Sequence, residues 1–272
     1  MRRIRLKKYD MTFMYIPVLI ISCLSVVAYV IRLFSRDTAD AVFFVGTAAV
    51  LCFFLTAGMN NRAFKIILVL LCVGYISVYF VLGNSLFALA AQKFSSNAVT
   101  FGFFDSLFNT AGIYDFQTLV YTTSYGGARL IGNQLVCGVS EIVKTDPDSS
   151  LVPYLSGRIL SLFAFSGILL AKKDNLRAHL LIIAFMFISG NTTPVLILLL
   201  FTSPVSYFLL LLANFFSFFA ANILDIGGAF VVSPSVFEIF YHSENVIYLL
   251  AVSALFCAVA YYLARVVSER KK

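Results

Sequence analysis

The feature that most constrains this chain is a set of apolar runs nearly as long as a membrane is thick. The runs cover residues 11–31, 39–57, 64–82, 178–223 and 246–264. A helix needs about 20 apolar residues to cross about 30 Å of hydrocarbon, and most of these runs have about that length. The sequence therefore predicts an all-α polytopic membrane protein.

Composition excludes the common soluble classes. Hydrophobic residues make up 61% of the chain and charged residues only 12%, whereas a soluble domain has roughly 45–50% apolar and about 25% charged residues. Nucleic-acid binding, a disulfide scaffold and a cytosolic metabolic enzyme are therefore excluded. The five Cys form no CxxC pair and there are only two His, so we expect reduced thiols, no metal and no cofactor.

Basic residues gather at both ends of the chain. Near the start they are Arg2, Arg3, Arg5, Lys7 and Lys8, and near the end Arg265, Arg270, Lys271 and Lys272. Because Lys and Arg mark the cytoplasmic side of a span, we expect both termini in the cytoplasm, with the protein in a bacterial inner membrane. No A-x-A-like cleavage site follows the first apolar run, which favours an uncleaved span over a signal peptide.

Amino-acid composition divides the chain into three regions. Residues 1–82 predict three spans, residues 83–150 are richer in Gly, Ser, Asn, Thr and Tyr, and residues 151–272 contain the remaining spans. In total we expect about 6–8 transmembrane helices with one or two re-entrant hairpins. The middle region fits either an outside loop domain with interfacial helices or a re-entrant hairpin that lines a cavity.

The run 178–223 is the most informative. One helix of this length would be about twice as long as the hydrocarbon is thick. The run is interrupted at 189–194 and again at Ser203-Pro204, so Gly190 and Pro194 predict a chain reversal or an unwound tip. Interrupted helices expose backbone groups to substrate in secondary transporters. A plain loop between two spans is the alternative.

Short segments between residues 99 and 270 match the order and approximate spacing of a known family. Gly190-Asn191-Thr192-Thr193-Pro194 stands where that family has G-I-T-E-P, and residues 224–238 echo its L-G-I-x-x-G-F-x-F-S-A-G-x-I-D stretch. Residues 145–150 are similar to its G-D-P-T-A-G element, and residues 171–175 to a polar A-K-x-x-N-like turn. On these segments the chain resembles the membrane (IIC) component of the sugar phosphotransferase system, glucose superfamily.

The resemblance implies an IIC-like permease component that binds or translocates a small neutral sugar or polyol. Membrane lipids would surround it, and its partners would be separate IIA and IIB proteins or a full-length IIC. Asn109 matches the Asn of the family's G-x-H-H-x-x-x-N hairpin, and the tip adds amide and hydroxyl groups. The candidate substrate-binding residues are Asp105, Asn109, Asn191, Thr192, Thr193 and Glu238.

Departures from the family pattern argue against phosphotransfer. The Glu of G-I-T-E-P, which in the family helps activate the sugar hydroxyl, is Thr193 here, a second family Glu is Leu196, and both His are missing from residues 103–109. No catalytic residue is therefore predicted. The alternative is a transport-inactive IIC relative that acts as a regulatory or interaction membrane protein. A membrane-embedded enzyme is the weakest hypothesis, because no Ser/His/Asp set, HExxH motif or paired-carboxylate spacing occurs.

The charged candidates also have structural alternatives. Asp105 would cap a helix over residues 101–111, while Asp225 and Glu238 would lie in a solvated outer loop. An ionisable residue at membrane depth is otherwise a functional hypothesis by default.

Arg158 is an anomaly, because apolar residues surround it within the span predicted for residues 151–171. It would snorkel to the interface, pair with Glu141 or Asp146, or bind an anionic ligand.

Overall fold

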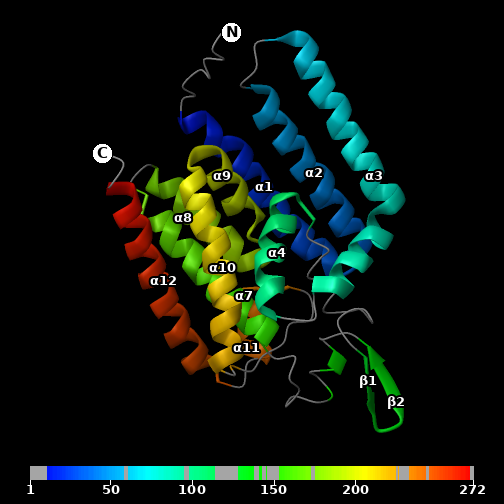
Figure 1. The fold of residues 1–272 in the computed structure, drawn as a ribbon, viewed down its shortest axis with the longest axis vertical. Coiled ribbons are helices and arrows are strands. Elements are labelled where there is room, and N and C mark those ends of the chain that lie inside the picture. Colours follow the sequence, from blue (N-terminus) through cyan, green and yellow to red (C-terminus); the bar gives the residue numbers. More distant parts are fainter. Residues whose placement is uncertain are drawn as a thin grey trace.

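The computed structural model describes residues 11–57, 61–94, 98–113, 128–137, 141–142, 145, 153–172, 175–224, 226, 233–242 and 245–269. Most of these residues lie in helices that pack side by side along the long axis (Figure 1). The elements are α1 (Met11–Arg32), α2 (Arg36–Ala57), α3 (Arg62–Phe94), α4 (Ala98–Thr110), β1 (Ala128–Ile131), β2 (Gln134–Cys137), α7 (Pro153–Leu170), α8 (Leu176–Ser189), α9 (Thr193–Thr202), α10 (Pro204–Leu224), α11 (Val236–His242) and α12 (Val246–Glu269).

Five of the described helices are long and apolar enough to cross a membrane. Their candidate spans are Met14–Arg32, Asp37–Ala57, Arg62–Val81, Pro204–Leu224 and Val246–Ser268. Shorter apolar helices cover Ser156–Leu170, Leu176–Ser189 and Thr193–Thr202. The described part of the chain therefore confirms the helical, multi-pass membrane class. The predicted total of six to eight spans goes beyond these five helices.

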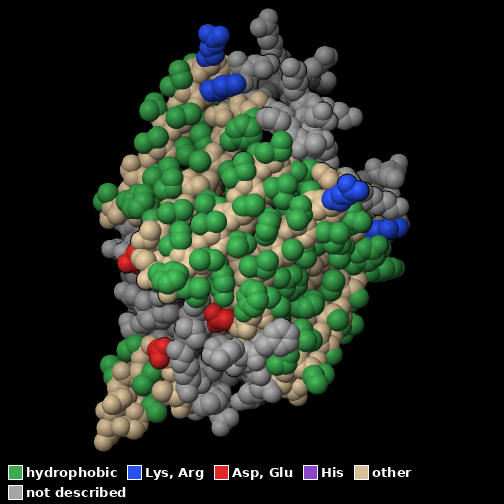
Figure 2. Space-filling model, turned by 180° about the vertical axis from the view of Figure 1, so that it is seen from behind, with side chains coloured by type: hydrophobic (Ala, Val, Ile, Leu, Met, Phe, Trp, Pro, Cys, Tyr) green, Lys and Arg blue, Asp and Glu red, His purple; other side chains and the backbone are tan. Residues whose placement is uncertain are grey.

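The outer surface of the bundle is apolar. Leu70 and Leu71 of α3 are each 64% exposed, and Ile247 of α12 is 83% exposed. Figure 2 shows hydrophobic side chains over most of one face, with the charged side chains mostly near its margins. Soluble proteins rarely leave so large an apolar area in water, so this surface fits contact with lipid.

The region 83–150 contains more regular structure than a loop. α3 continues past the predicted end of the third span, residue 82, to Phe94, because residues 86–92 are rich in the strong helix formers Ala and Leu. Strands β1 and β2 pair antiparallel through Gly132 and Asn133, whose φ angles of 56° and 68° suit a two-residue hairpin turn. The all-α prediction missed this hairpin, which lies at the edge of the fold (Figure 1).

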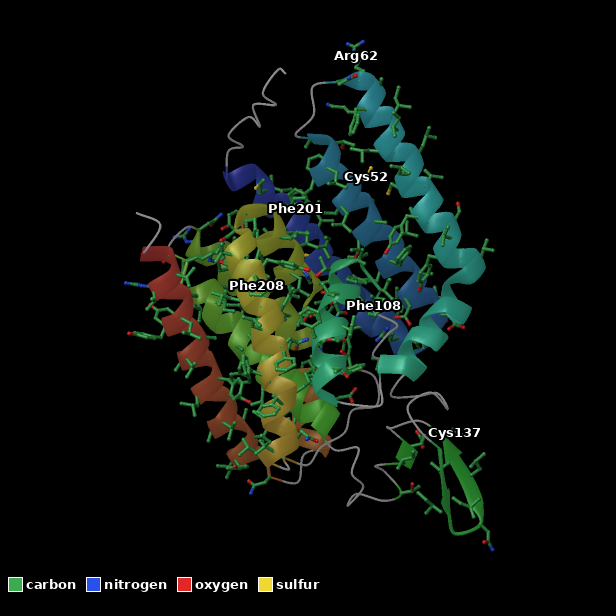
Figure 3. All side chains as sticks on the ribbon, viewed as in Figure 1. Cys52, Arg62, Phe108, Cys137, Phe201 and Phe208 are labelled. Carbon is green, nitrogen blue, oxygen red and sulfur yellow. The ribbon has the colours of Figure 1, made fainter. Side chains whose placement is uncertain are left out.

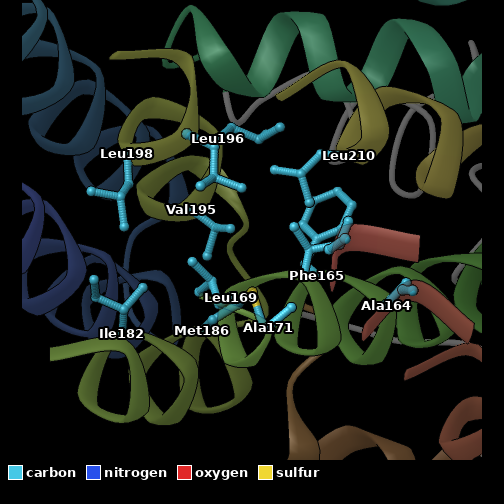
Figure 4. Packing of buried hydrophobic residues seen from close by; sticks show 14 of the residues in the cluster. Ala164, Phe165, Leu169, Ala171, Ile182, Met186, Val195, Leu196, Leu198 and Leu210 are labelled. Carbon is cyan, nitrogen blue, oxygen red and sulfur yellow. The ribbon is translucent and has the colours of Figure 1, made fainter. Parts of the chain in front are cut away.

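α7 lies at the centre of one half of the bundle and packs against α10 and α12. Its close approach to α12 depends on Gly167, because a Cβ there would lie 2.2 Å from the carbonyl oxygen of Cys257. Beside this contact, Leu169 of α7, Met186 of α8 and Val195 of α9 belong to one buried apolar cluster (Figure 4). α7 therefore connects the packing of α12 to that of the α8–α9 pair.

α8 and α9 form a helical hairpin whose two outer ends lie together. Lys172, just before α8, donates a hydrogen bond of 3.4 Å from Nζ to Thr202 Oγ1 at the end of α9. At the inner end, α8 stops at Ser189 and α9 begins at Thr193. Helices of 14 and 10 residues are about 21 and 15 Å long. Neither is long enough to cross about 30 Å of hydrocarbon.

The tip of this hairpin lies within the bundle, beside α1. The Tyr15 hydroxyl lies 2.8 Å from His179 Nε2 near the start of α8, and Ser25 Oγ lies 3.2 Å from Ser189 Oγ at its end. α1 and α8 therefore run parallel. Because α1 continues beyond Ser25 to Arg32, the tip ends before the bundle does.

We predict that Gly167→Ala destabilises the protein, because the added Cβ forces α7 and α12 apart. The matched control is Gly74→Ala on α3, where a Cβ would meet nothing within 4 Å. Overpacking costs about 1–3 kcal/mol, so thermal unfolding in detergent should give a clearly lower Tm for G167A and little change for G74A. Equal melting temperatures for the two variants would contradict this account of the α7–α12 contact.

Candidate functional site

A buried ion pair joins α4 to α7 inside the bundle. Arg158 Nη1 lies 2.8 Å from Asp105 Oδ2, and Arg158 Nη2 donates a hydrogen bond of 3.3 Å to Asp105 Oδ1. Arg158 is 1% exposed and Asp105 is fully buried. Taking charges out of water costs several kcal/mol per ion, so such a pair requires close geometry and additional hydrogen bonds.

This pair corrects the structural alternatives for both residues. Asp105 lies well inside α4, so it does not cap that helix. Arg158 is buried and pairs with Asp105, so the predicted snorkelling and the predicted pairing with Glu141 are wrong. Asp146 and Asp225, the other acidic candidates, lie outside the described residues.

Asn214 of α10 connects the ion pair to its surroundings. Its Nδ2 atom lies 3.3 Å from Asp105 Oδ2 and 2.6 Å from Ser106 Oγ, and it also donates to the carbonyl oxygen of Gly102. The Ser161 hydroxyl of α7 donates to Asn214 Oδ1. This single amide therefore fixes the positions of α4, α7 and α10 relative to one another.

The tip of the α8–α9 hairpin places Thr192 on the ion pair. Gly190 ends α8 with a φ of 68°, a left-handed conformation that glycine adopts without steric cost. Asn191 Oδ1 accepts a hydrogen bond of 2.9 Å from the N–H of Thr193, which fixes the turn into α9. Thr192 Oγ1 then accepts a hydrogen bond of 3.3 Å from Arg158 Nη1.

Polar side-chain atoms on α4, α7 and α9 are buried without a hydrogen-bond partner. They are Asn109 Oδ1 and Nδ2, Thr193 Oγ1 and Arg158 Nε. Asn109 comes one turn after Asp105, on the same face of α4. An unsatisfied buried polar group costs about 1–3 kcal/mol. These atoms are therefore donors and acceptors that a small polar ligand or water would satisfy.

Glu238 supports the tip from a different segment. Glu238 Oε1 accepts a hydrogen bond of 3.2 Å from the N–H of Ser233, and the Ser233 hydroxyl donates to the carbonyl oxygen of Ser189. Ser233 also closes over Gly190, where a Cβ would lie 2.4 Å from Ser233 Oγ. Glu238 is only 9% exposed, so a solvated loop is the wrong environment for it.

The structure thus divides the predicted residues into two groups. Asp105 and Thr192 contact the same guanidinium, and Asn109 lies on the same helix face as Asp105. Thr193, which follows Thr192 in the chain, belongs with these residues because its hydroxyl is also buried without a partner. Asn191 and Glu238 instead shape and support the tip. Asn214 was not among the predicted residues, although it is the one amide side chain within the apolar residues 207–216.

The arrangement suits binding of an uncharged molecule. Both carboxylate oxygens of Asp105 are engaged by Arg158 or Asn214, whereas a general base must reach the proton that it removes. Asp105 also neutralises the charge of Arg158, so amide, hydroxyl and N–H groups are what the site offers. Within the described ranges, no group of three or more His, Cys, Asp or Glu side chains is placed to bind a metal ion.

Comparisons with protein-family models, with curated proteins and with solved structures gave no match. A function for this chain must therefore be inferred from the geometry of its described residues.

We predict that breaking the Asp105–Arg158 pair costs more than removing it. Arg158→Met leaves a buried carboxylate without its partner and should destabilise the protein by about 3–5 kcal/mol. The double variant Asp105→Leu/Arg158→Met should recover part of this loss, because it removes both charges. The measurement is a double-mutant cycle of thermal unfolding in detergent. Additive losses across the cycle would show that the two residues are not coupled.

Proposed function

We propose that this chain is an IIC-like membrane component, related to the sugar phosphotransferase system, that binds a small neutral sugar or polyol at the tip of the α8–α9 hairpin. The unpartnered buried polar atoms on Asn109, Thr193 and Arg158 carry this proposal. The amide of Asn109 and the hydroxyl of Thr193 both donate and accept hydrogen bonds, as sugar hydroxyls do. A bound polyol would satisfy these groups.

In this proposal the α8–α9 hairpin is re-entrant in the membrane. Its helices, about 21 and 15 Å long, come from and return to the end marked by the Lys172–Thr202 contact. Irregular backbone at membrane depth is tolerated where protein buries it or where it lines a cavity, and Gly190, Asn191 and Thr192 are all buried. If α7 is counted as a sixth span beside the five candidate spans, the number of transmembrane helices is six, the lower end of the expected range of 6–8.

A second candidate function is a transport-inactive relative that acts as a regulatory or interaction protein. The observation that favours it is the engagement of Asp105 by Arg158 and Asn214. Because Thr193 replaces the acidic residue of the family motif, none of these groups is placed to activate a sugar hydroxyl. The partner would then be a IIA or IIB protein or a full-length IIC. Ligand binding without ligand movement into liposomes would favour this candidate.

We also propose a bacterial inner membrane location with both termini in the cytoplasm. The start of α1 and the end of α12 lie at the same end of the fold (Figure 1), and the chain is basic at both ends. A fluorescent protein that matures only in the cytoplasm should therefore fluoresce when it is fused to either terminus. Activity of a periplasm-dependent phosphatase fused after Lys272 would contradict this orientation.

We predict that one class of sugar or polyol raises the Tm of the purified protein. The panel contains hexoses, amino sugars, disaccharides and polyols, and a hundredfold excess over Kd stabilises the folded state by about 2.7 kcal/mol. Thr193→Val should weaken this shift while leaving the unliganded protein folded, because the lost hydroxyl has no partner. Thr47→Val on α2, which also removes a buried hydroxyl without a partner, should keep the shift.

Two results would overturn this assignment. If no sugar or polyol of the panel changes the Tm of the well-folded protein, the sugar-binding proposal is wrong. Equal affinity in wild type and Thr193→Val, with a clear shift in both, would retain the ligand but move its site away from the tip.

A further inference from the structure

Two cysteines, Cys52 and Cys72, lie on neighbouring turns where α3 packs on α2. The Cys72 thiol lies 3.3 Å from the carbonyl oxygen of Ala48. In a helix this carbonyl is the acceptor for the backbone N–H of Cys52, so the Cys72 thiol lies beside the backbone of Cys52. Cys52 comes one turn after Ala48 on α2. Because helical side chains lean toward the N-terminus of their helix, the Cys52 side chain covers the turn that Cys72 contacts.

This contact belongs to a continuous antiparallel stripe. Phe44 of α2 stacks on Tyr79 of α3 with ring centroids 3.7 Å apart, and its ring centroid is 5.0 Å from that of Tyr75. Two turns further along α2 is Cys52, and two turns back along α3 from Tyr79 is Cys72. The register set by the aromatic rings therefore places the two cysteines at the same level of the contact between α2 and α3. Figure 3 shows Cys52 on the side of α2 that faces α3.

These contacts with α2 make up most of the packing of α3 against the rest of the described structure. None of the residues in its span Arg62–Val81 is buried, and among the described elements α3 packs mainly on α2, with a smaller contact to α4. Just beyond the end of α4, the carbonyl oxygen of Ala111 accepts a hydrogen bond of 2.7 Å from the Tyr75 hydroxyl. In lipid no hydrophobic driving force holds helices together, so van der Waals packing and a few hydrogen bonds must do so.

We propose that Cys52 and Cys72 are a redox-sensitive pair whose oxidation links α3 covalently to α2. In this step two thiols lose two protons and two electrons, and one S–S bond forms. The co-reactant is a two-electron oxidant of the azo class, such as diamide, which takes up both protons and both electrons and becomes a hydrazine. A dithiol reductant reverses the step by thiol–disulfide exchange.

The link has a physical consequence for the fold. A disulfide between these positions closes the α2–α3 connection into a loop and removes freedom from the state in which α3 has separated from α2. A helix held by one stripe thus becomes fixed in register. The pair is not apparent from sequence spacing, because the two residues lie on different helices and form no CxxC motif.

The test uses the full chain, purified in detergent, with Cys23, Cys137 and Cys257 replaced by Ser. After treatment with diamide, maleimide labelling should show loss of both remaining thiols, in a monomer whose mass has fallen by about 2 Da, the mass of two hydrogens. Dithiothreitol should restore both. The oxidised form should also unfold at a higher temperature than the reduced form.

Two matched controls separate a specific pair from general thiol reactivity. Cys72→Ser in the same background leaves one thiol, which should remain available to maleimide. Adding Val73→Cys to that variant moves the second thiol by about 100° around α3, to a position that is 55% exposed, and no internal link should form.

Peptide mapping of the oxidised wild-type protein keeps the test independent of the folding of the variants. A cross-linked peptide containing Cys52 and Cys72 is expected. Retention of both thiols after diamide, links only between two chains, or equal linkage from position 73 would overturn the proposal. No ligand enters this experiment, so its outcome is independent of the proposed sugar site.

Discussion

The Asp105–Arg158 ion pair is the interaction on which the inner arrangement depends. In a membrane, apolar packing alone specifies the positions of helices weakly. Lipid hydrocarbon is as apolar as the side chains of a neighbouring helix, so an apolar side chain can contact either one. A buried charge has no such alternative and must find its partner. Through this pair α4 is fixed to α7, Asn214 adds α10, and Thr192 adds the tip of the α8–α9 hairpin. Four elements are thus placed by polar contacts within a largely apolar bundle.

The hairpin tip is held from more than one direction, and this matters for binding. Arg158 contacts it through Thr192, while Ser233 contacts the end of α8 at Ser189 and is itself positioned by Glu238. A tip fixed in this way does not have to be ordered when a ligand arrives, so less of the interaction free energy is lost to ordering. The buried groups without partners beside it are therefore held in place before any ligand binds.

Sequence alone predicted the parts of this structure that depend on chain length and local geometry. Runs of apolar residues gave the membrane class, and Gly190 and Pro194 marked the place where α8 ends and α9 begins. The partner of Arg158 was not predictable in this way, because Asp105 is 53 residues away and no local pattern relates the two. Local signals also misplaced Glu238, since an acidic residue in a polar segment looks solvated until tertiary packing buries it.

The position of the charge also bears on the proposed function. The family motif has an acidic residue at the tip, whereas here the tip carries Thr193 and the nearby carboxylate of Asp105 is engaged by Arg158. Groups placed in this way can form hydrogen bonds with a hydroxyl, but they are not placed to deprotonate it. The two proposed functions therefore share one ligand-binding step and differ in the fate of the bound ligand. In the proposed permease the bound ligand would go on to cross the membrane, whereas in the proposed regulatory protein it would remain at the tip.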